Sequence, residues 1–132
     1  MRRLFCVVTL ALVAGACVVA RAAGTPGSVS FKADVQPILD ENCVACHQSG
    51  SPAQGLALED GKSWKALVRA PSRESKLMLV APGDPDGSYV VHKLEGTQGH
   101  LGAGAQMPLG DPISPAKVAI IRHWIASGAP QN

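Results

Sequence analysis

Apolar residues recur at helical spacing shortly after residue 30, and this pattern predicts the first helix. The positions that would share one helix face are Phe31, Val35, Ile38 and Leu39. Ser30 is a favoured N-cap residue, so the helix is predicted over about 31–42. Pro37 lies inside that range, and because proline lacks an amide hydrogen it should kink the helix or delay its start.

A second periodic stretch, near residue 120, predicts the last helix. Ser114 suits the N-cap, Pro115 the first helical position, and Gly128 the position just beyond the end. The expected buried stripe of this helix consists of Val118, Ile121, Trp124 and Ile125.

Two shorter helices are predicted between these, joined by loops rich in glycine and proline. One follows Asp60, and the other is expected to be capped by Asp86 and to end at Gly96. Residues 76–81 suggest an extended segment, and residues 96–108 a glycine-rich loop. The apolar residues assigned to the short helices are Trp64, Leu67, Val68, Tyr89, Val90 and Leu94. No long alternating pattern and no internal repeat is present, so the predicted fold class is all-α.

Residues 1–22 have the pattern of an export signal. A basic start at Arg2 and Arg3 precedes a 17-residue apolar run, which leads into the small-residue cleavage pattern of residues 20–22. The alternatives are an uncleaved membrane anchor and a lipoprotein attached through Cys17. In each case the protein would be exported, either to the periplasm or out of the cell.

Cleavage after Ala22 would leave a flexible leader over residues 23–30 and one small domain over residues 31–132. The remaining 110 residues carry 9 basic and 10 acidic side chains, a net charge of −1 in place of the +2 of the whole chain. This near-neutral balance argues against nucleic acid as a partner, and the short chain excludes a two-domain enzyme. The same residues hold 13 Gly and 10 Pro but only four aromatic side chains, so the core is expected to need a staple or a cofactor.

Cys43, Cys46 and His47 form a C-x-x-C-H pattern, which is the attachment motif of c-type haem. One helical turn separates the two thiols, and this is about the span of the two vinyl groups on one porphyrin edge. His47 follows at once, so one ring nitrogen can bind the iron, while the other is expected to donate to a carbonyl in the loop around Pro52. The predicted cofactor is one covalently attached haem c, which would also supply the missing apolar centre.

Three other interpretations of the motif have less support in the sequence. A structural zinc site needs a fourth ligand, usually from a second cysteine cluster, and the other histidines, His92, His100 and His123, are scattered. A thioredoxin-type redox pair needs a βαβ context. A local disulfide between the two cysteines is the last alternative.

Met107 is the candidate for the sixth iron ligand. It lies 60 residues after His47, follows the flexible glycine-rich loop, and has neighbours that do not indicate a core position. His100 is the main rival for this role. Met78, by contrast, lies in an apolar run and is expected to pack in the core.

Further stretches between residues 31 and 129 match a known family. They are Phe31–Leu39 before the haem motif, Gly55–Leu58, Pro82–Pro85 with Ser88 and Tyr89, Gln106–Pro108, and His123–Ile125 with Gly128 and Ala129. On these residues the chain resembles class I cytochromes c, and among them the planctomycete-type cytochrome c domain. The resemblance implies a haem enclosed between N- and C-terminal helices that cross near Phe31 and Trp124, with His47 and Met107 as axial ligands. The long Gly/Ala-rich stretch before Met107 departs from the family pattern.

The predicted function is that of a monohaem c-type cytochrome, which carries single electrons between transient redox protein partners. No catalytic residue is expected, because Glu59 and Asp60 are adjacent and would not converge on one substrate. Lys65 and Arg69 could reach a haem propionate but suggest a solvated helix face. The alternatives are a haem enzyme, peroxidase-like or associated with a dehydrogenase, and a haem-based ligand sensor. No stable membrane span is expected after signal cleavage, and a monomer is favoured.

Overall fold

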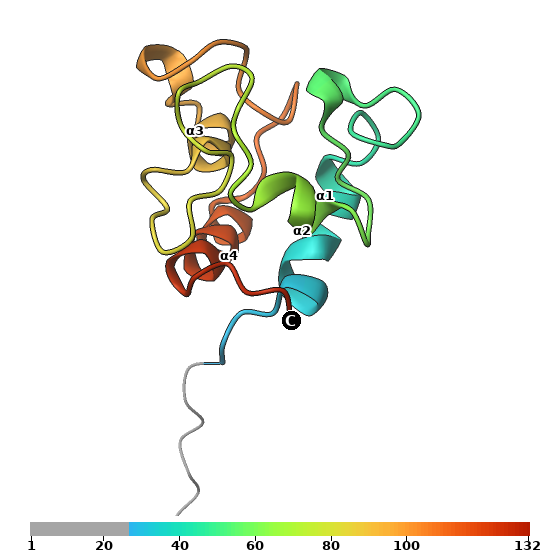
Figure 1. Cartoon of the computed structure of the whole chain (residues 1–132), viewed down its shortest axis with the longest axis vertical. Helices are drawn as coiled ribbons and strands as arrows, with labels where there is room; N and C mark the ends of the chain where they lie inside the picture. Colours follow the sequence, from blue (N-terminus) through green and yellow to red (C-terminus); the bar gives the residue numbers. More distant parts are fainter. Residues whose placement is uncertain (1–26) are drawn as a thin grey trace, which may run out of the picture.

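The computed structural model describes residues 27–132, so the predicted export signal and residues 23–26 of the leader lie outside the described residues. Regular structure in residues 27–132 is helical, with isolated backbone bridges but no strand, which confirms the all-α class. The helical elements (Figure 1) are η1 Phe31–Val35, α1 Gln36–Asn42, η2 Ala53–Gly55, α2 Ser63–Leu67, α3 Tyr89–Glu95, η3 Gln98–His100 and α4 Pro115–Ala126.

The N-terminal helix opens with one π-helical turn, η1, and continues as α1. Ser30 Oγ accepts a hydrogen bond from the Ala33 N–H at 3.1 Å, which confirms the predicted N-cap. The Gln36 N–H bonds to the Phe31 carbonyl, five residues back, so the helix is widened just before Pro37. Pro37 therefore lies in the first turn of α1, where its missing N–H leaves no helical bond unmade.

The C-terminal helix, α4, forms over its predicted range. Ser114 Oγ accepts a hydrogen bond from the Lys117 N–H at 3.4 Å, and Pro115 occupies the first turn. Gly128 lies beyond the end with a left-handed φ of +99°, which glycine adopts without a side-chain clash. The predicted stripe is buried: Val118, Ile121, Trp124 and Ile125.

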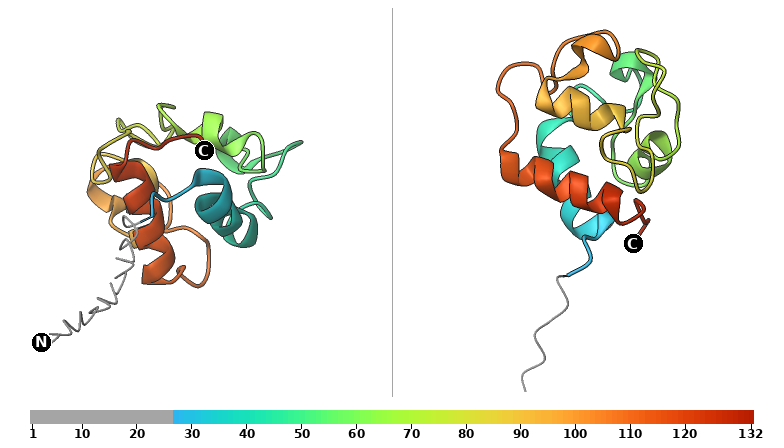
Figure 2. Two further views of the ribbon diagram at one scale, coloured as in Figure 1. Left: turned by 90° about the horizontal axis from the view of Figure 1, so that it is seen from below. Right: turned by 90° about the vertical axis from the view of Figure 1, so that its left-hand side faces the viewer.

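The C-terminal helix crosses the N-terminal helix, as the right-hand view of Figure 2 shows. The rings of Phe31 and Trp124 lie 5.0 Å apart and are tilted by 40°, at the contact that the family resemblance implied. The Trp124 indole also donates to the Pro130 carbonyl at 2.9 Å, and the Lys32 N–H donates to the Asn132 carbonyl at 2.9 Å. The first and last helices thus form one packed unit.

The predicted cap of α3 is wrong. The sequence favours Asp86, but α3 begins at Tyr89 and Ser88 occupies the cap position. Ser88 is buried, and its hydroxyl accepts from the Ala81 N–H at 2.8 Å and donates to the Asp84 carbonyl at 2.7 Å. The hydroxyl is engaged by the preceding turn, and for that reason it does not cap the helix.

The prediction that Met78 packs in the core is also wrong, because its side chain is 47% exposed. Residues 76–81 form no strand: the segment bends at Lys76, Leu77 and Leu79, and isolated backbone bridges hold Met78, Val80 and Ala81. The Met78 carbonyl accepts from the Tyr89 N–H at 2.9 Å. Val80 in the same run is fully buried. The apolar side chains of this run therefore do not all face the core.

The two middle helices are short and agree with the prediction in their remaining boundaries. The α2 helix follows Asp60, and Gly96 ends α3 in a left-handed conformation. None of the helices in residues 27–132 is long and apolar enough to span a membrane.

Candidate functional site

A cavity of about 410 Å³ is lined by residues from α1, α2, α3 and α4 and from the loops that connect them. Figure 1 shows α1 and α2 on one side of the fold and α3 on the other. The apolar lining includes Leu39, Leu67, Val80, Val90, Leu94 and Ile121. Small-molecule and cofactor sites typically measure about 300–1,000 Å³, so this space suits one ligand of cofactor size.

The four residues predicted to hold the cofactor all line this cavity: Cys43, Cys46, His47 and Met107. Cys43 is half-buried, Cys46 is exposed, and both are free thiols in this structure. Burial raises the pKa of the Cys43 thiol to about 11, so this thiol is protonated at neutral pH. The fold therefore brings a methionine and a motif 60 residues away from it to one apolar space.

The cysteine motif forms a tight turn directly after α1. The Cys43 N–H bonds to the Leu39 carbonyl at 2.8 Å and closes the helix. The Cys43 carbonyl then accepts from the N–H groups of Cys46, at 3.1 Å, and His47, at 3.0 Å. These bonds set the two cysteines one turn apart, as their spacing predicts.

The ring of His47 is oriented by a backbone carbonyl. Its Nδ1 lies 3.0 Å from the Leu56 carbonyl oxygen, and since a carbonyl can only accept, Nδ1 carries the hydrogen and Nε2 keeps a free lone pair. The sequence predicts an acceptor around Pro52, and the structure has it four residues later, after the short helix η2. The Leu58 N–H donates to the His47 carbonyl at 2.7 Å, so the same loop fixes both ends of the residue.

Met107 is half-buried and is held through its backbone, since its N–H donates to the Lys93 carbonyl at 2.8 Å. The neighbouring Gln106 side chain donates to the Leu94 carbonyl at 3.0 Å, a second bond to α3. His100 is exposed and is not among the residues that line the cavity. The geometry therefore favours Met107 over His100 as a residue facing the cofactor space.

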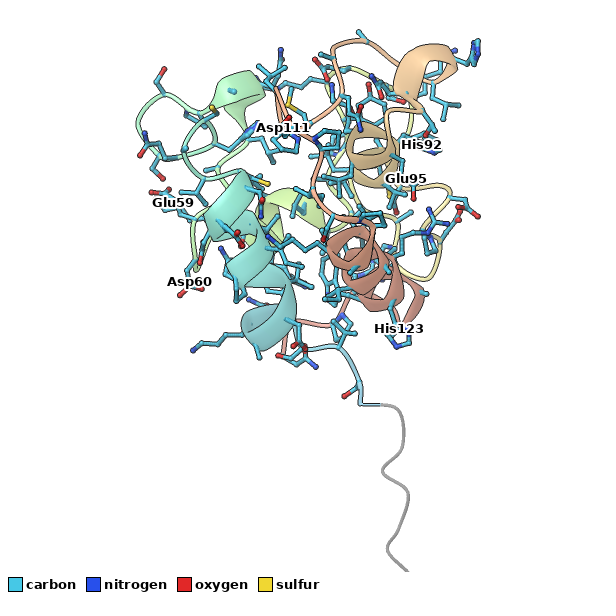
Figure 3. All side chains as sticks on the ribbon, turned by 180° about the vertical axis from the view of Figure 1, so that it is seen from behind. Glu59, Asp60, His92, Glu95, Asp111 and His123 are labelled. Atoms are coloured by element: carbon cyan, nitrogen blue, oxygen red, sulfur yellow. The ribbon has the colours of Figure 1, made fainter. Side chains whose placement is uncertain are left out.

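The remaining titratable side chains that the sequence singles out lie at the periphery. Figure 3 shows His92 and His123 at one edge of the molecule and Glu59 and Asp60 at the other. Hydrogen bonds from the side chain and backbone of Ser49 hold the pKa of Glu59 below its ordinary value. Within residues 27–132 no three His, Cys, Asp or Glu side chains are grouped as a metal site would need, so the zinc alternative gains no support.

Sequence reasoning missed the charged residues of the cavity wall. Lys65 and Arg69 are exposed and do not line the cavity, which agrees with a solvated face. The basic residues that line it are Arg73 and Lys93. Spacing could have indicated Lys93, because it lies four residues after Tyr89 on the apolar face of α3. No sequence signal marks Arg73, which comes from an irregular loop.

The two basic residues of the wall differ in their partners. Lys93 is buried and its Nζ lies 3.0 Å from Glu74 Oε2. Arg73 is exposed and pairs with no acidic side chain of residues 27–132. Its guanidinium lies beside Gly55, where an added β-carbon would come within 2.7 Å of it.

No family model, curated protein or solved structure matches this chain. Two thiols, an imidazole with a free Nε2 and a thioether surround one apolar space, and nitrogen and sulfur donors of this kind suit iron in a haem. An unpaired guanidinium at the wall adds a site for a carboxylate.

Proposed function

We propose that this chain is an exported monohaem c-type cytochrome that carries single electrons between redox partners. The observation that carries the proposal is the cavity of about 410 Å³ that the C-x-x-C-H motif and Met107 line together. The proposal includes a class I cytochrome c fold, in which η1, α1 and α4 would cross and enclose the cofactor. The contact between Phe31 and Trp124 supports this arrangement.

The roles of the binding residues follow from their chemistry. Each thiol, Cys43 and Cys46, would add across one vinyl group, forming a carbon–sulfur bond while the thiol hydrogen goes to the other vinyl carbon. His47 would bind the iron through Nε2, because its Nδ1 hydrogen is committed to the Leu56 carbonyl. Met107 would provide a thioether as the second protein ligand of the iron.

With His47 and Met107 both bound to the iron, the chain's own residues would exclude water and small ligands from the metal. When bound, the haem supplies an iron atom that can gain and lose one electron. A fixed imidazole, a fixed thioether and an apolar wall would keep the surroundings of the iron unchanged between its two oxidation states. The thioether and the apolar wall would also raise the reduction potential, which favours the ferrous state. Redox partners would dock transiently through a small interface.

Replacing Met107 with alanine tests the proposal. The ferric wild-type protein is expected to show the weak far-red band of sulfur–iron ligation, and the Met107→Ala variant should lose it completely. The variant should also bind carbon monoxide rapidly when reduced, because its sixth position is open. Met78→Ala is the matched control, since Met78 is exposed and lies outside the cavity lining, and it should keep the band.

Other outcomes of these spectra would contradict parts of the proposal. A far-red band that persists in Met107→Ala would exclude Met107 as the ligand. Rapid carbon monoxide binding by the reduced wild-type protein would favour a ligand sensor, and steady turnover of peroxide would favour a peroxidase. A purified protein that contains zinc and no iron would overturn the proposal altogether.

Arg73 is proposed to pair with a haem propionate, because its guanidinium is the cavity's unpaired cation within residues 27–132. Arg73→Gln should lower the reduction potential by tens of millivolts, since an uncompensated carboxylate favours the ferric iron and partial exposure weakens the effect. Arg69→Gln is the control: Arg69 is also exposed but does not line the cavity. Equal potentials in the two variants, measured by redox titration, would argue against this pairing.

A further inference from the structure

We infer that Glu74 and Lys93 form a largely buried ion pair that positions the Met107 segment, so that both are positioning residues for the sixth iron ligand. This inference rests on the proposed function. The segment concerned, residues 102–107, joins η3 to the cavity wall. It is attached to the ion pair, to Tyr89 and to the backbone of α3 at successive positions.

The ion pair touches the segment directly. Lys93 Nζ lies 3.0 Å from Glu74 Oε2 and also donates to the Ala103 carbonyl at 3.4 Å. The Glu74 carbonyl accepts from the Ala103 N–H at 2.9 Å. The Tyr89 hydroxyl donates to the same Ala103 carbonyl at 2.6 Å. Ala103 is thus held at both its N–H and its carbonyl.

Two glycines of the segment lie in close contact with the cluster formed by Glu74, Lys93 and Tyr89. A β-carbon on Gly104 would lie 2.6 Å from Lys93 Nζ and 2.7 Å from Glu74 Oε1. A β-carbon on Gly102 would lie 2.5 Å from the Tyr89 hydroxyl oxygen and 2.5 Å from the Glu74 carbonyl oxygen. The sequence predicts that these glycines make the loop flexible, and the structure adds a steric role: at Gly102 a side chain would clash with backbone, and at Gly104 it would displace the ion pair and strain a φ of +79°.

Lys93 also connects the cluster to the ligand itself. Its side chain holds Ala103, while its carbonyl accepts the Met107 N–H at 2.8 Å. Both ends of the segment therefore depend on one residue of α3. All three residues, Lys93, Glu74 and Met107, line the same cavity. A displacement of the ion pair would therefore also displace the Met107 thioether from the position in which it could bind the iron.

The Glu74–Lys93 pair is sufficiently buried that each charge needs the other to compensate for its loss of contact with water. The side chains of Lys93 and Glu74 are 9% and 21% exposed, whereas those of the surface pair Lys117 and Glu41 are 30% and 66% exposed. Removing one member of a buried pair leaves an uncompensated charge, which tends to move toward water. Such a movement would carry the Ala103 backbone with it.

The experiment compares Glu74→Gln, Lys93→Met and the double variant in the haem-loaded, full-length chain. The readouts are the far-red sulfur–iron band and the affinity of the ferric protein for added imidazole, which competes with the methionine. Each single variant should weaken the band and raise imidazole affinity about 10–100-fold, the usual size of effects from residues that orient a ligand. In the double variant the imidazole affinity and the band should differ from those of the wild-type protein by less than the two single effects combined, because no uncompensated charge remains.

Lys117→Met and Glu41→Gln are the matched controls, since they break an ion pair of the same type at the surface. Both should keep the wild-type band and imidazole affinity. A purely structural role for Lys93 and Glu74 would lower the urea midpoint but leave both readouts unchanged in the folded protein. Unchanged readouts in folded Glu74→Gln and Lys93→Met would therefore overturn the inference.

If neither Glu74→Gln nor Lys93→Met yields folded, haem-loaded protein, Tyr89→Phe tests the inference instead. It removes the hydroxyl that donates to Ala103 and keeps the buried ring. Loss of one such bond should raise imidazole affinity about 2–10-fold, and an unchanged affinity would overturn the inference. The proposed function fails separately, if the wild-type protein itself lacks haem or the far-red band.

Discussion

Replacing both Cys43 and Cys46 with alanine is expected to leave the exported chain without covalently bound haem. With neither thiol present no thioether can form, and His47 is the last residue of the motif able to bind iron. Acidified organic solvent should then extract all pigment, and a denaturing gel should show no haem stain at the position of the chain. The yield of folded protein should fall by about tenfold or more, because the cavity loses the group proposed to fill it.

Two variants inside the motif serve as controls for this result. Ala45→Ser changes an exposed residue between the cysteines and should mature like the wild-type protein. Cys46→Ala keeps the half-buried Cys43 and should retain one thioether, so its pigment should still resist extraction. Pigment that resists extraction in the double variant would show that these cysteines do not attach it.

The chain produced without haem is expected to lose its fixed tertiary packing. Leaving all of the 410 Å³ empty would cost at most about 10 kcal/mol, at roughly 24 cal/mol per Å³ of closed cavity, and less where water enters its open side. That cost is comparable to the whole stability of a typical domain, about 5–15 kcal/mol. The helices of residues 27–132 cannot offset it alone, since α4 has only 12 residues and η1 and α1 together have no more.

Circular dichroism of the haem-free and haem-loaded forms in one buffer measures this effect. The haem-free chain should lack the near-ultraviolet signal of packed aromatic residues and should unfold in urea without a sharp transition. Trp124 is the most informative reporter, because its ring is buried against Phe31 in the folded protein. A colourless chain with cooperative unfolding and native aromatic signals would contradict the proposal that haem completes this core.

Local signals in the sequence predicted much of the fold. Ser30 and Ser114 cap their helices, Gly96 and Gly128 follow helix ends, and the stripe containing Trp124 is buried. Each of these depends on residues a few positions apart, where backbone geometry and side-chain chemistry are tightly coupled. The motif residues and Met107 were also predicted, and the fold brings them to one cavity.

The features that the sequence did not predict depend on contacts outside the helix patterns. The α3 helix begins at Tyr89, so Ser88 and not Asp86 occupies its cap position, and the Ser88 hydroxyl bonds back to the preceding turn. Met78 is 47% exposed, although Val80 two residues later is fully buried. Lys93 is buried because Glu74, 19 residues earlier, supplies the opposite charge. For Lys93 the decisive partner lies outside the local window that sequence patterns sample, whereas the partners of Ser88 are only four and seven residues away, in a turn whose bonds the helix pattern does not specify.

The crowding at residues 102 and 104 divides the glycine-rich loop into positions with different tolerance to mutation. An added β-carbon at Gly99 meets no atom within 4 Å, so alanine or serine can occupy that position freely. Variation in a library of this loop should thus accumulate at Gly99, while glycine is kept at Gly102 and Gly104 and at the left-handed Gly96 that ends α3.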